Sequence, residues 1–505
     1  MTMVSHLIAD LQKFDESLSR EHYLNSSGQK DELESSKIYK KFKHLFSKEH
    51  ISEANKDISN REGKLLYDAF VGNFIGNELK KINDKCSSFE ASATVEVSGQ
   101  QIPFRSVSSL LMNEDVREKR KIYYESTRPV KKKLTSFEKR SWAKVYDLIK
   151  ELSGKSYVDY LSFIKEVDYD SLAVQFRDFL VKTEELHRQQ LEKNMASIGV
   201  RLKDAQPYDY AYYARAKPFD QFFKKENLVN VAKSFWRDVG IEIGSQKNVI
   251  LDVDDRPKKV PRAFCMPVRV PEEVILVIKP HGGQDDYQAF LHESGHTEHF
   301  ANTDGSLSYQ FKQLGDNSVS ESYAFLIEYL LSNTLFLQKY LQMSEVDAQK
   351  FANFIMEQKL QAFRRYASKV IYELKLHRND LTKLDDKFQP TAGAYTSPAK
   401  MYADLLTKAT KINYNPESYL LDVDSGLYAA DYCRAWMFEV MIRKKLEEKY
   451  GKNWFEKKEA GDFLKAMWKC GNSSKNVNEL AQMIGYEKVD IAYIADDFLK
   501  FFKQA

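Results

Sequence analysis

Helical periodicity is the feature that most constrains what this chain can fold into. Segments such as SLAVQFRDFLVKTEELHRQQLEKNMASIG (171–199) and ESYAFLIEYLLSNTLFLQKYLQ (321–342) place apolar residues three and four positions apart, which is the period of an α-helix. Only 20 Gly and 12 Pro interrupt the 505 residues, so the sequence favours long helices over many short strands. We therefore predict a mainly α-helical fold, almost wholly helical to about residue 200 and helical again beyond residue 300.

One region between these helical parts predicts β-structure. PRAFCMPVRV and EVILVIKP are short, apolar and rich in β-branched residues, and are expected to form a hairpin over about 261–280. The segment HGGQDDYQAFLHESGHTEHF (281–300) follows, in which two glycines loosen the chain before Asp285 or Asp286 caps a new helix. A loop is predicted near KFQPTAGAYTSP (387–398).

Composition and charge exclude several classes of function. Hydrophobic residues make up 43% and aromatic residues 13% of the chain, enough for a large core. The net charge of +3 gives no reason to expect a nucleic-acid partner, and no apolar run reaches the roughly 18 residues of a membrane helix. Four scattered cysteines suit the reduced thiols of a cytoplasmic protein, either monomer or dimer. The basic segment 116–140 also contains three glutamates, which favours a solvated helix over a surface for an acidic partner.

The helix expected after the hairpin contains the pattern H-E-x-x-H. His292 and His296 are four residues apart, so both imidazoles project from one face of a helix and can hold one metal ion. Glu293 lies one step round the helix, close enough to act as a general base on a metal-activated water. This pattern on a helix is typical of a catalytic zinc site; a polar helix face without metal is the alternative.

Catalytic zinc needs a third protein ligand and one open position. His299 is close in sequence, but a carboxylate on a later helix is favoured. Glu321 begins a strongly apolar helix 25 residues after His296, where a charge needs a partner, and zinc would be one. Glu328, seven residues further on, falls on nearly the same face and is expected to orient a ligand imidazole; His299 is left with a supporting role.

These residues resemble the thimet oligopeptidase and oligoendopeptidase family of zinc peptidases. That family carries H-E-F-G-H-A-L-H, and residues 292–299 here read HESGHTEH. A glutamate about 25 residues on and another seven later match Glu321 and Glu328. Weaker echoes lie in NEDVREKRKIYYES (113–126) and FRRYASKVIYELKLH (363–377).

A further similarity lies near the C-terminus, where SGLYAADYCRAWMFEV (425–440) resembles the family's G-Y-x-A-x-Y-Y-x-Y-L-W segment. The tyrosines of that segment bind substrate and stabilise the oxyanion. Tyr428 and Tyr432 each stand one position away from the pattern, and Arg434 takes a tyrosine position. We expect the two tyrosines to have a catalytic role and Arg434, with His281 of the loop before the helix, to contact substrate.

The resemblance implies a two-lobed helical zincin with a deep substrate channel and a small antiparallel sheet beside the zinc helix. Residues 1–200 are expected to form an N-terminal helical region of the channel wall, and 201–505 the catalytic region. The strand EVILVIKP (273–280) is expected to pair with the substrate backbone as an edge strand. The implied activity is hydrolysis of internal bonds in short peptides, with one Zn²⁺ per chain.

Three alternatives remain open from the sequence. A metallocarboxypeptidase of the same helical fold needs a cation for the terminal carboxylate, and Arg434, Arg364 or Arg365 is a candidate. A non-catalytic peptide-binding homologue is the second, because the tyrosine segment departs from the family pattern. A helical interaction protein that uses the basic segment 116–140 is the third.

Overall fold

The computed structural model describes residues 3–379 and 395–504, and its architecture is mainly α-helical, as predicted. The predicted loop near 387–398 lies largely outside the described residues. In the first half of the chain the α-helices are Met3–Ser26 (α1), Ser35–Lys41 (α2), Lys48–Ala54 (α3), Arg61–Ser92 (α4), Val107–Asn113 (α5), Arg117–Ser126 (α6), Arg128–Ser153 (α7), Tyr157–Lys165 (α8), Tyr169–Lys182 (α9), Glu184–Ser197 (α10), Pro207–Ala214 (α11) and Leu228–Asp238 (α12). In the second half they are Gln284–Ala301 (α13), Tyr309–Gln313 (α14), Ser318–Glu328 (α15), Thr334–Leu341 (α16), Glu345–His377 (α17), Pro398–Thr410 (α18), Tyr428–Tyr450 (α19), Lys458–Trp468 (α20), Val477–Met483 (α21) and Ile491–Gln504 (α22). The strands are Thr94–Val97 (β1), Gln100–Pro103 (β2), Val249–Asp252 (β3), Phe264–Arg269 (β4) and Glu273–Val277 (β5).

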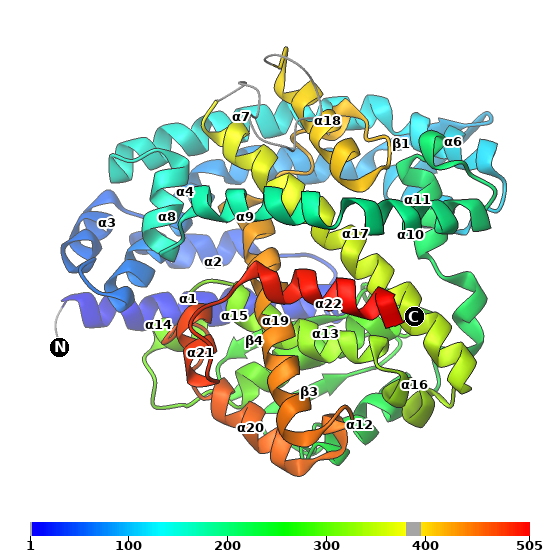
Figure 1. Cartoon of the computed structure of the whole chain (residues 1–505). Helices are drawn as coiled ribbons and strands as arrows, with labels where there is room; N and C mark the ends of the chain where they lie inside the picture. The colour runs from blue at the N-terminus through cyan, green and yellow to red at the C-terminus, as the bar shows by residue number, and fades with distance from the viewer. Residues whose placement is uncertain (1–2, 380–394, 505) are drawn as a thin grey trace.

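Two long helices connect the upper and lower parts of the molecule. Figure 1 shows α4, α7, α9 and α18 in the upper part, and α12, α13, α20 and the strands β3 and β4 in the lower part. Helix α17 runs between them and contacts α9 and α18 at one end and α16 at the other. Helix α19 contacts α15, α17 and α20. Both helices therefore hold the two parts together.

One continuous buried cluster forms most of the core. It contains side chains from Leu7 on α1 to Phe498 on α22, so residues on both sides of position 200 share it. Helix α1 also packs against β4, which brings the start of the chain to the sheet. The expected assignment of 1–200 and 201–505 to separate regions stays a prediction.

The predicted hairpin over 261–280 is confirmed as the antiparallel pair β4–β5. The sheet is nevertheless mixed rather than antiparallel, because β3 pairs parallel with β5 and the strand order is β3-β5-β4. The prediction of EVILVIKP as an edge strand is therefore wrong: β5 is the central strand. The edge that faces α13 is β4.

A second hairpin corrects the prediction that the chain is almost wholly helical to residue 200. Strands β1 and β2 pair antiparallel around Ser98 and Gly99, which have φ values of 51° and 81°. Positive φ at both central residues defines a tight hairpin turn of the primed type. The alternation in TVEV and the following Ser-Gly are the sequence signals that we did not use.

The start of α13 also differs from its prediction. Its N-cap is Gly283, and no side chain makes a capping hydrogen bond there. Asp285 and Asp286 lie in the first turn instead, where acidic residues stabilise the positive end of the helix dipole. The carboxylate of Asp286 accepts hydrogen bonds from the backbone N–H groups of His281 and Gly282, at 2.5 and 2.6 Å. It therefore fixes the loop that leads into the helix.

Three other features bear on the expectations from composition. The basic segment 116–140 forms α6 and α7, and within it Arg117 and Arg120 pair with the buried carboxylate of Asp209. All four cysteines are free. In the described part of the chain, no helix is long and apolar enough to span a membrane.

Candidate metal centre and cavity

Helices α13 and α15 approach each other closely because Gly295 lies between them. A Cβ atom at this position would stand 2.7 Å from the Cα of Ala324 and 2.8 Å from the carbonyl oxygen of Tyr323. Real Cβ atoms do not come that close to backbone, so glycine is required at this contact. The close approach brings the first turn of α15, with Glu321, to the histidines of α13.

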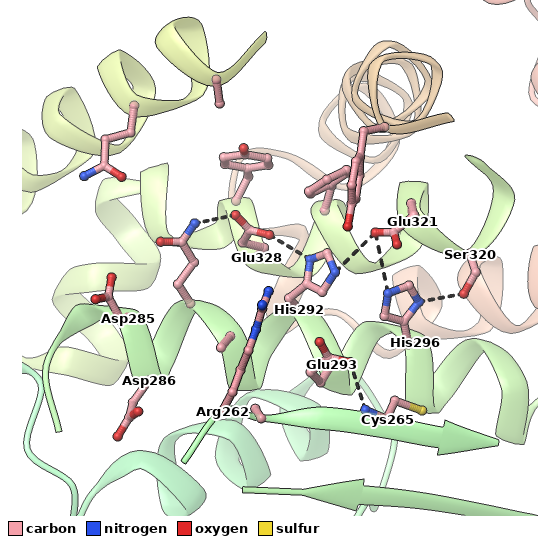
Figure 2. A pocket seen from close by; sticks show the side chains of 18 of the residues that line it. Arg262, Cys265, Asp285, Asp286, His292, Glu293, His296, Ser320, Glu321 and Glu328 are labelled. Atoms are coloured by element: carbon pink, nitrogen blue, oxygen red, sulfur yellow. Dashed lines mark hydrogen bonds and ion pairs between the residues drawn. The ribbon is translucent and has the colours of Figure 1, made fainter. Parts of the chain in front are cut away.

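Three side-chain atoms converge where these helices meet. Figure 2 shows His292 and His296 pointing from α13 toward Glu321 on α15. Glu321 Oε2 lies 3.2 Å from His292 Nε2 and 3.6 Å from His296 Nε2. One ligand atom from each of the three residues lies within 4.8 Å of the others. The structure therefore places the three predicted metal ligands together.

The remaining nitrogen of each imidazole is held by a neighbour. Nδ1 of His292 lies 2.7 Å from Oε2 of Glu328, whose other oxygen accepts a hydrogen bond of 2.6 Å from Gln288. Nδ1 of His296 lies 2.6 Å from Oγ of Ser320. Hydrogen bonds of this kind fix the ring orientation and tautomer of metal-binding histidines. Both Nε2 atoms are thereby directed at Glu321 (Figure 2).

The donor set fits a zinc ion. Oε2 of Glu321 is buried without a hydrogen-bond partner, which is costly for a carboxylate oxygen unless a cation satisfies it. A tetrahedral ion with bonds of about 2.0–2.1 Å keeps its ligand atoms about 3.3 Å apart. The spacings of 3.2 and 3.6 Å are close to this value. Two imidazoles and one carboxylate form a ligand set that zinc uses in catalytic sites.

The electrostatic environment of the group favours a positive charge. Burial lowers the pKa of His292, but the neighbouring carboxylates of Glu321 and Glu328 outweigh this effect and hold that pKa well above its usual value. Burial alone would raise the pKa of Glu321, but the neighbouring His296 and His292 have the larger effect and lower this pKa. Two carboxylates thus attract a positive charge, either a proton on an imidazole or a bound cation.

Glu293 lies beside this group and is held by the edge strand. The backbone N–H of Cys265 on β4 donates a hydrogen bond of 2.9 Å to Oε2 of Glu293. This contact orients the carboxylate and leaves its second oxygen toward the cavity that Glu293 lines (Figure 2). A carboxylate in this arrangement can accept and return a proton.

The predicted tyrosines of α19 close the group from the opposite side. The hydroxyl of Tyr428 donates a hydrogen bond of 2.6 Å to Oε1 of Glu321. The ring of Tyr432 packs edge-on against Tyr428, with centroids 4.7 Å apart, and both residues line the cavity. Glycine at position 426 has a φ of 69°, which lets the chain turn into α19 so that these side chains face the histidines.

A cavity of about 1380 Å³ is bounded by the candidate metal group. Its wall is formed by the start of β4, one face of α13, one face of α15 along its length, the first turns of α19, the middle of α17, and part of α5. His281, predicted to contact substrate, lines this cavity. The volume is large enough for a peptide of several residues and exceeds the usual size of a small-molecule pocket.

Two other predicted residues, His299 and Arg434, lie away from the ligand atoms. His299 is buried, its Nε2 is 3.2 Å from the carbonyl oxygen of Gly471, and burial lowers its pKa to about 3, so the ring is neutral. It therefore belongs to the core rather than to the support of the ligands. Arg434, expected to contact substrate, is buried in an ion pair with Asp316 and is not among the described residues that line the cavity.

The two other arginines considered for a carboxypeptidase, Arg364 and Arg365, also form ion pairs with other residues. Arg364 is buried, donates to the carbonyl oxygens of Leu180 and Ala409, and pairs with Glu184. Arg365 pairs with Asp422. Neither is among the described residues of the cavity wall.

Sequence reasoning missed four contributors to the site. Ser320 and Gln288 lie next to, or one turn from, predicted residues, so helical spacing could have suggested them. The backbone N–H of Cys265 carries no sequence signal. Arg262, directly before β4, lines the cavity and was read only as part of the hairpin.

The fold and this site define the class with which the chain can be compared: helical proteins with a His-His-Glu group on the wall of a large cavity. The structure is similar to a solved protein from Bacillus anthracis str. Ames described as a "putative oligoendopeptidase F", with a TM-score of 0.62 and 14% sequence identity. The match covers 98% of this chain and 84% of that chain. At this identity the likeness establishes a shared fold. No family model and no curated protein matches the sequence.

Proposed function

We propose that this protein is a zinc-dependent metallopeptidase that hydrolyses internal bonds of short peptides. The observation that carries the proposal is the convergence of His292, His296 and the unsatisfied oxygen of Glu321 on the wall of a peptide-sized cavity. The shared fold with a protein described as an oligoendopeptidase supports it. When bound, zinc supplies Lewis-acid chemistry, which lowers the pKa of a water molecule and polarises a carbonyl.

Glu293 is the residue that moves the proton. Its Oε2 accepts the Cys265 N–H, and its other oxygen takes a proton from the attacking water. The same carboxyl group then gives the proton to the leaving amine of the cleaved peptide. The rigid hydrogen bond to β4 keeps the acceptor oxygen in one place through both transfers.

The tyrosines of α19 act on the opposite side of the substrate. Tyr428 holds Glu321 through its hydroxyl, so in this structure it positions a metal ligand. Tyr432 packs beside it on the cavity wall and is the better candidate to donate to the developing oxyanion. Donation there stabilises charge that appears only in the transition state.

The walls of the cavity also indicate the kind of substrate. An extended peptide would add to the edge strand β4 through the backbone groups that Glu293 and Gln313 do not already occupy. This assigns to β4 the role that was first expected of EVILVIKP. Helices form most of the cavity wall, and we infer that short peptides, rather than folded proteins, are the substrates that enter it.

The proposal is tested with Glu293→Gln. We expect the purified wild-type chain to contain one zinc ion and to cleave internally quenched fluorescent peptides. The variant should retain zinc and lose turnover by about 10²–10⁴-fold, the usual contribution of general acid–base catalysis. Unchanged turnover in the variant, or a wild-type chain that binds no zinc, would refute the proposal.

A further inference from the structure

Arg262 is the one cationic side chain of the described cavity wall that has no anionic partner. The wall contains Arg215, Arg262 and Lys359 among its described residues. Arg215 forms a bidentate pair with Asp220, and Lys359 pairs with the buried Glu439. Arg262 is exposed, and neither a hydrogen bond nor an ion pair joins it to any described residue. Its guanidinium group is therefore available to a ligand.

The position of Arg262 directs it at the space above the candidate metal group. It lies on the segment that enters β4, three residues before the Cys265 N–H that holds Glu293. Figure 2 shows its side chain pointing from the start of the strand into the pocket, toward the face of α13 that carries His292. A peptide lying along β4 would pass this side chain.

The charge of Arg262 also reaches the opposite wall. Burial is the main influence on the pKa of Tyr432 and raises it, while the positive charge of Arg262 acts in the other direction. Tyr432 stands on α19, across the cavity from β4. The guanidinium group thus lies within electrostatic reach of both walls between which a substrate would be bound.

We propose that Arg262 is a specificity-determining residue that binds a carboxylate of the peptide substrate close to the bond to be cleaved. This inference rests on the proposed peptidase function and names a substrate class for it: peptides with an acidic side chain or a free C-terminus at the position that meets Arg262. A guanidinium group presents planar donors that match a carboxylate in a bidentate pair. The ion pairs of Arg434, Arg364 and Arg365 leave those arginines unavailable for this task.

The test measures binding separately from catalysis. Full-length, zinc-loaded protein carrying Glu293→Gln is titrated with five-residue peptides whose other side chains are uncharged, with Glu or Gln at each position in turn and the C-terminus free or amidated. We expect one carboxylate, terminal or side-chain, to tighten binding about tenfold or more, as a charge-assisted hydrogen bond does. The peptide series that shows this tighter binding tells whether the carboxylate belongs to a side chain or to the C-terminus.

Substitutions of Arg262 in the same background then assign the preference. Arg262→Gln should bring the affinity ratio of carboxylate to amide peptide close to one, Arg262→Lys should keep part of it, and Arg262→Glu should reverse it in favour of a Lys-containing peptide. Arg269→Gln is the matched control, because Arg269 lies at the end of β4, the strand that Arg262 precedes, is exposed and does not line the cavity. It should leave the ratio unchanged.

Two failures are distinguishable. A ratio near one in the Arg262-containing protein, or a preference that survives Arg262→Gln in a chain with an unchanged unfolding temperature, overturns the inference even if the wild type cleaves peptides. Absence of cleavage by the wild type overturns the proposed function. The ratio of the affinities for carboxylate and amide peptides still decides whether Arg262 binds a carboxylate.

Discussion

Two groups of buried charged residues lie on neighbouring helices and differ in whether their charges are balanced. The closed cluster consists of Lys359 on α17, Glu439 and Arg443 on α19, and Asp497 on α22. Lys359 pairs with Glu439, Arg443 donates to Glu439 at 3.0 Å, and Arg443 also pairs with Asp497 at 2.5 Å. The two cations and two carboxylates of these four residues cancel, the more exposed Glu447 adds a carboxylate 3.7 Å from Arg443, and no buried side-chain nitrogen or oxygen of the four residues lacks a hydrogen-bond partner.

The open cluster consists of His292, His296, Glu321 and Glu328 and is not balanced. Its two carboxylates pair with imidazoles alone, no described lysine or arginine pairs with them, and one oxygen of Glu321 has no hydrogen-bond partner. It also lines the cavity, which the three C-terminal members of the closed cluster do not. Burial of charge therefore does not by itself mark a site. An unsatisfied acceptor, excess negative charge and access to a cavity together do so.

The largest difference between the clusters should appear in Glu321→Gln. Loss of the carboxylate removes a ligand and one negative charge from the open cluster, so we expect zinc to be lost and peptide turnover to fall by about a thousandfold or more. Metal analysis by mass spectrometry and the fluorescent-peptide assay measure both effects. Retained stoichiometric zinc would show that the open cluster is not the metal site.

Glu439→Gln should have the opposite profile. It leaves Lys359 buried without its charged partner, so we expect the free energy of unfolding to fall by about 3–5 kcal/mol. Zinc content should stay at one ion per chain, because the closed cluster holds no ligand. Urea denaturation with metal analysis provides the comparison, and a loss of less than about 1 kcal/mol would argue against a balanced buried pair.

Glu328→Gln should have an intermediate effect on the open cluster alone. The amide keeps the shape of the carboxylate but holds His292 less strongly, so zinc affinity should decrease about 10- to 100-fold while the fold is retained. Competition with a chelator of known affinity measures this change. Equal affinity in variant and wild type would mean that Glu328 does not orient His292.

The sequence predicted the parts of the site that depend on local spacing. His292, Glu293 and His296 follow from the helical period, and Glu321 with Glu328 from the same period in the apolar helix that became α15. The β4–β5 hairpin was accessible because consecutive apolar segments with a short connection pair locally. Even Ser320 was within reach, since it adjoins Glu321.

Long-range pairing was not accessible in the same way. Strand β3 lies parallel to β5 through a crossover, and only the fold shows that β5 is therefore central and β4 is the edge. Arg434 and Arg262 are the same residue type, yet Arg434 pairs with Asp316 of the loop before α15 and Arg262 pairs with no described anion. Which cation is free depends on the tertiary structure, and a single sequence does not specify it.

The central claim is that the open cluster is a zinc site, and anomalous diffraction at the zinc absorption edge from crystals of the zinc-loaded protein tests it most directly. The account predicts one strong peak per chain, about 2.0–2.2 Å from Nε2 of His292, Nε2 of His296 and an oxygen of Glu321. A peak on a different group of residues, or no peak at these three atoms in zinc-loaded crystals, would contradict it.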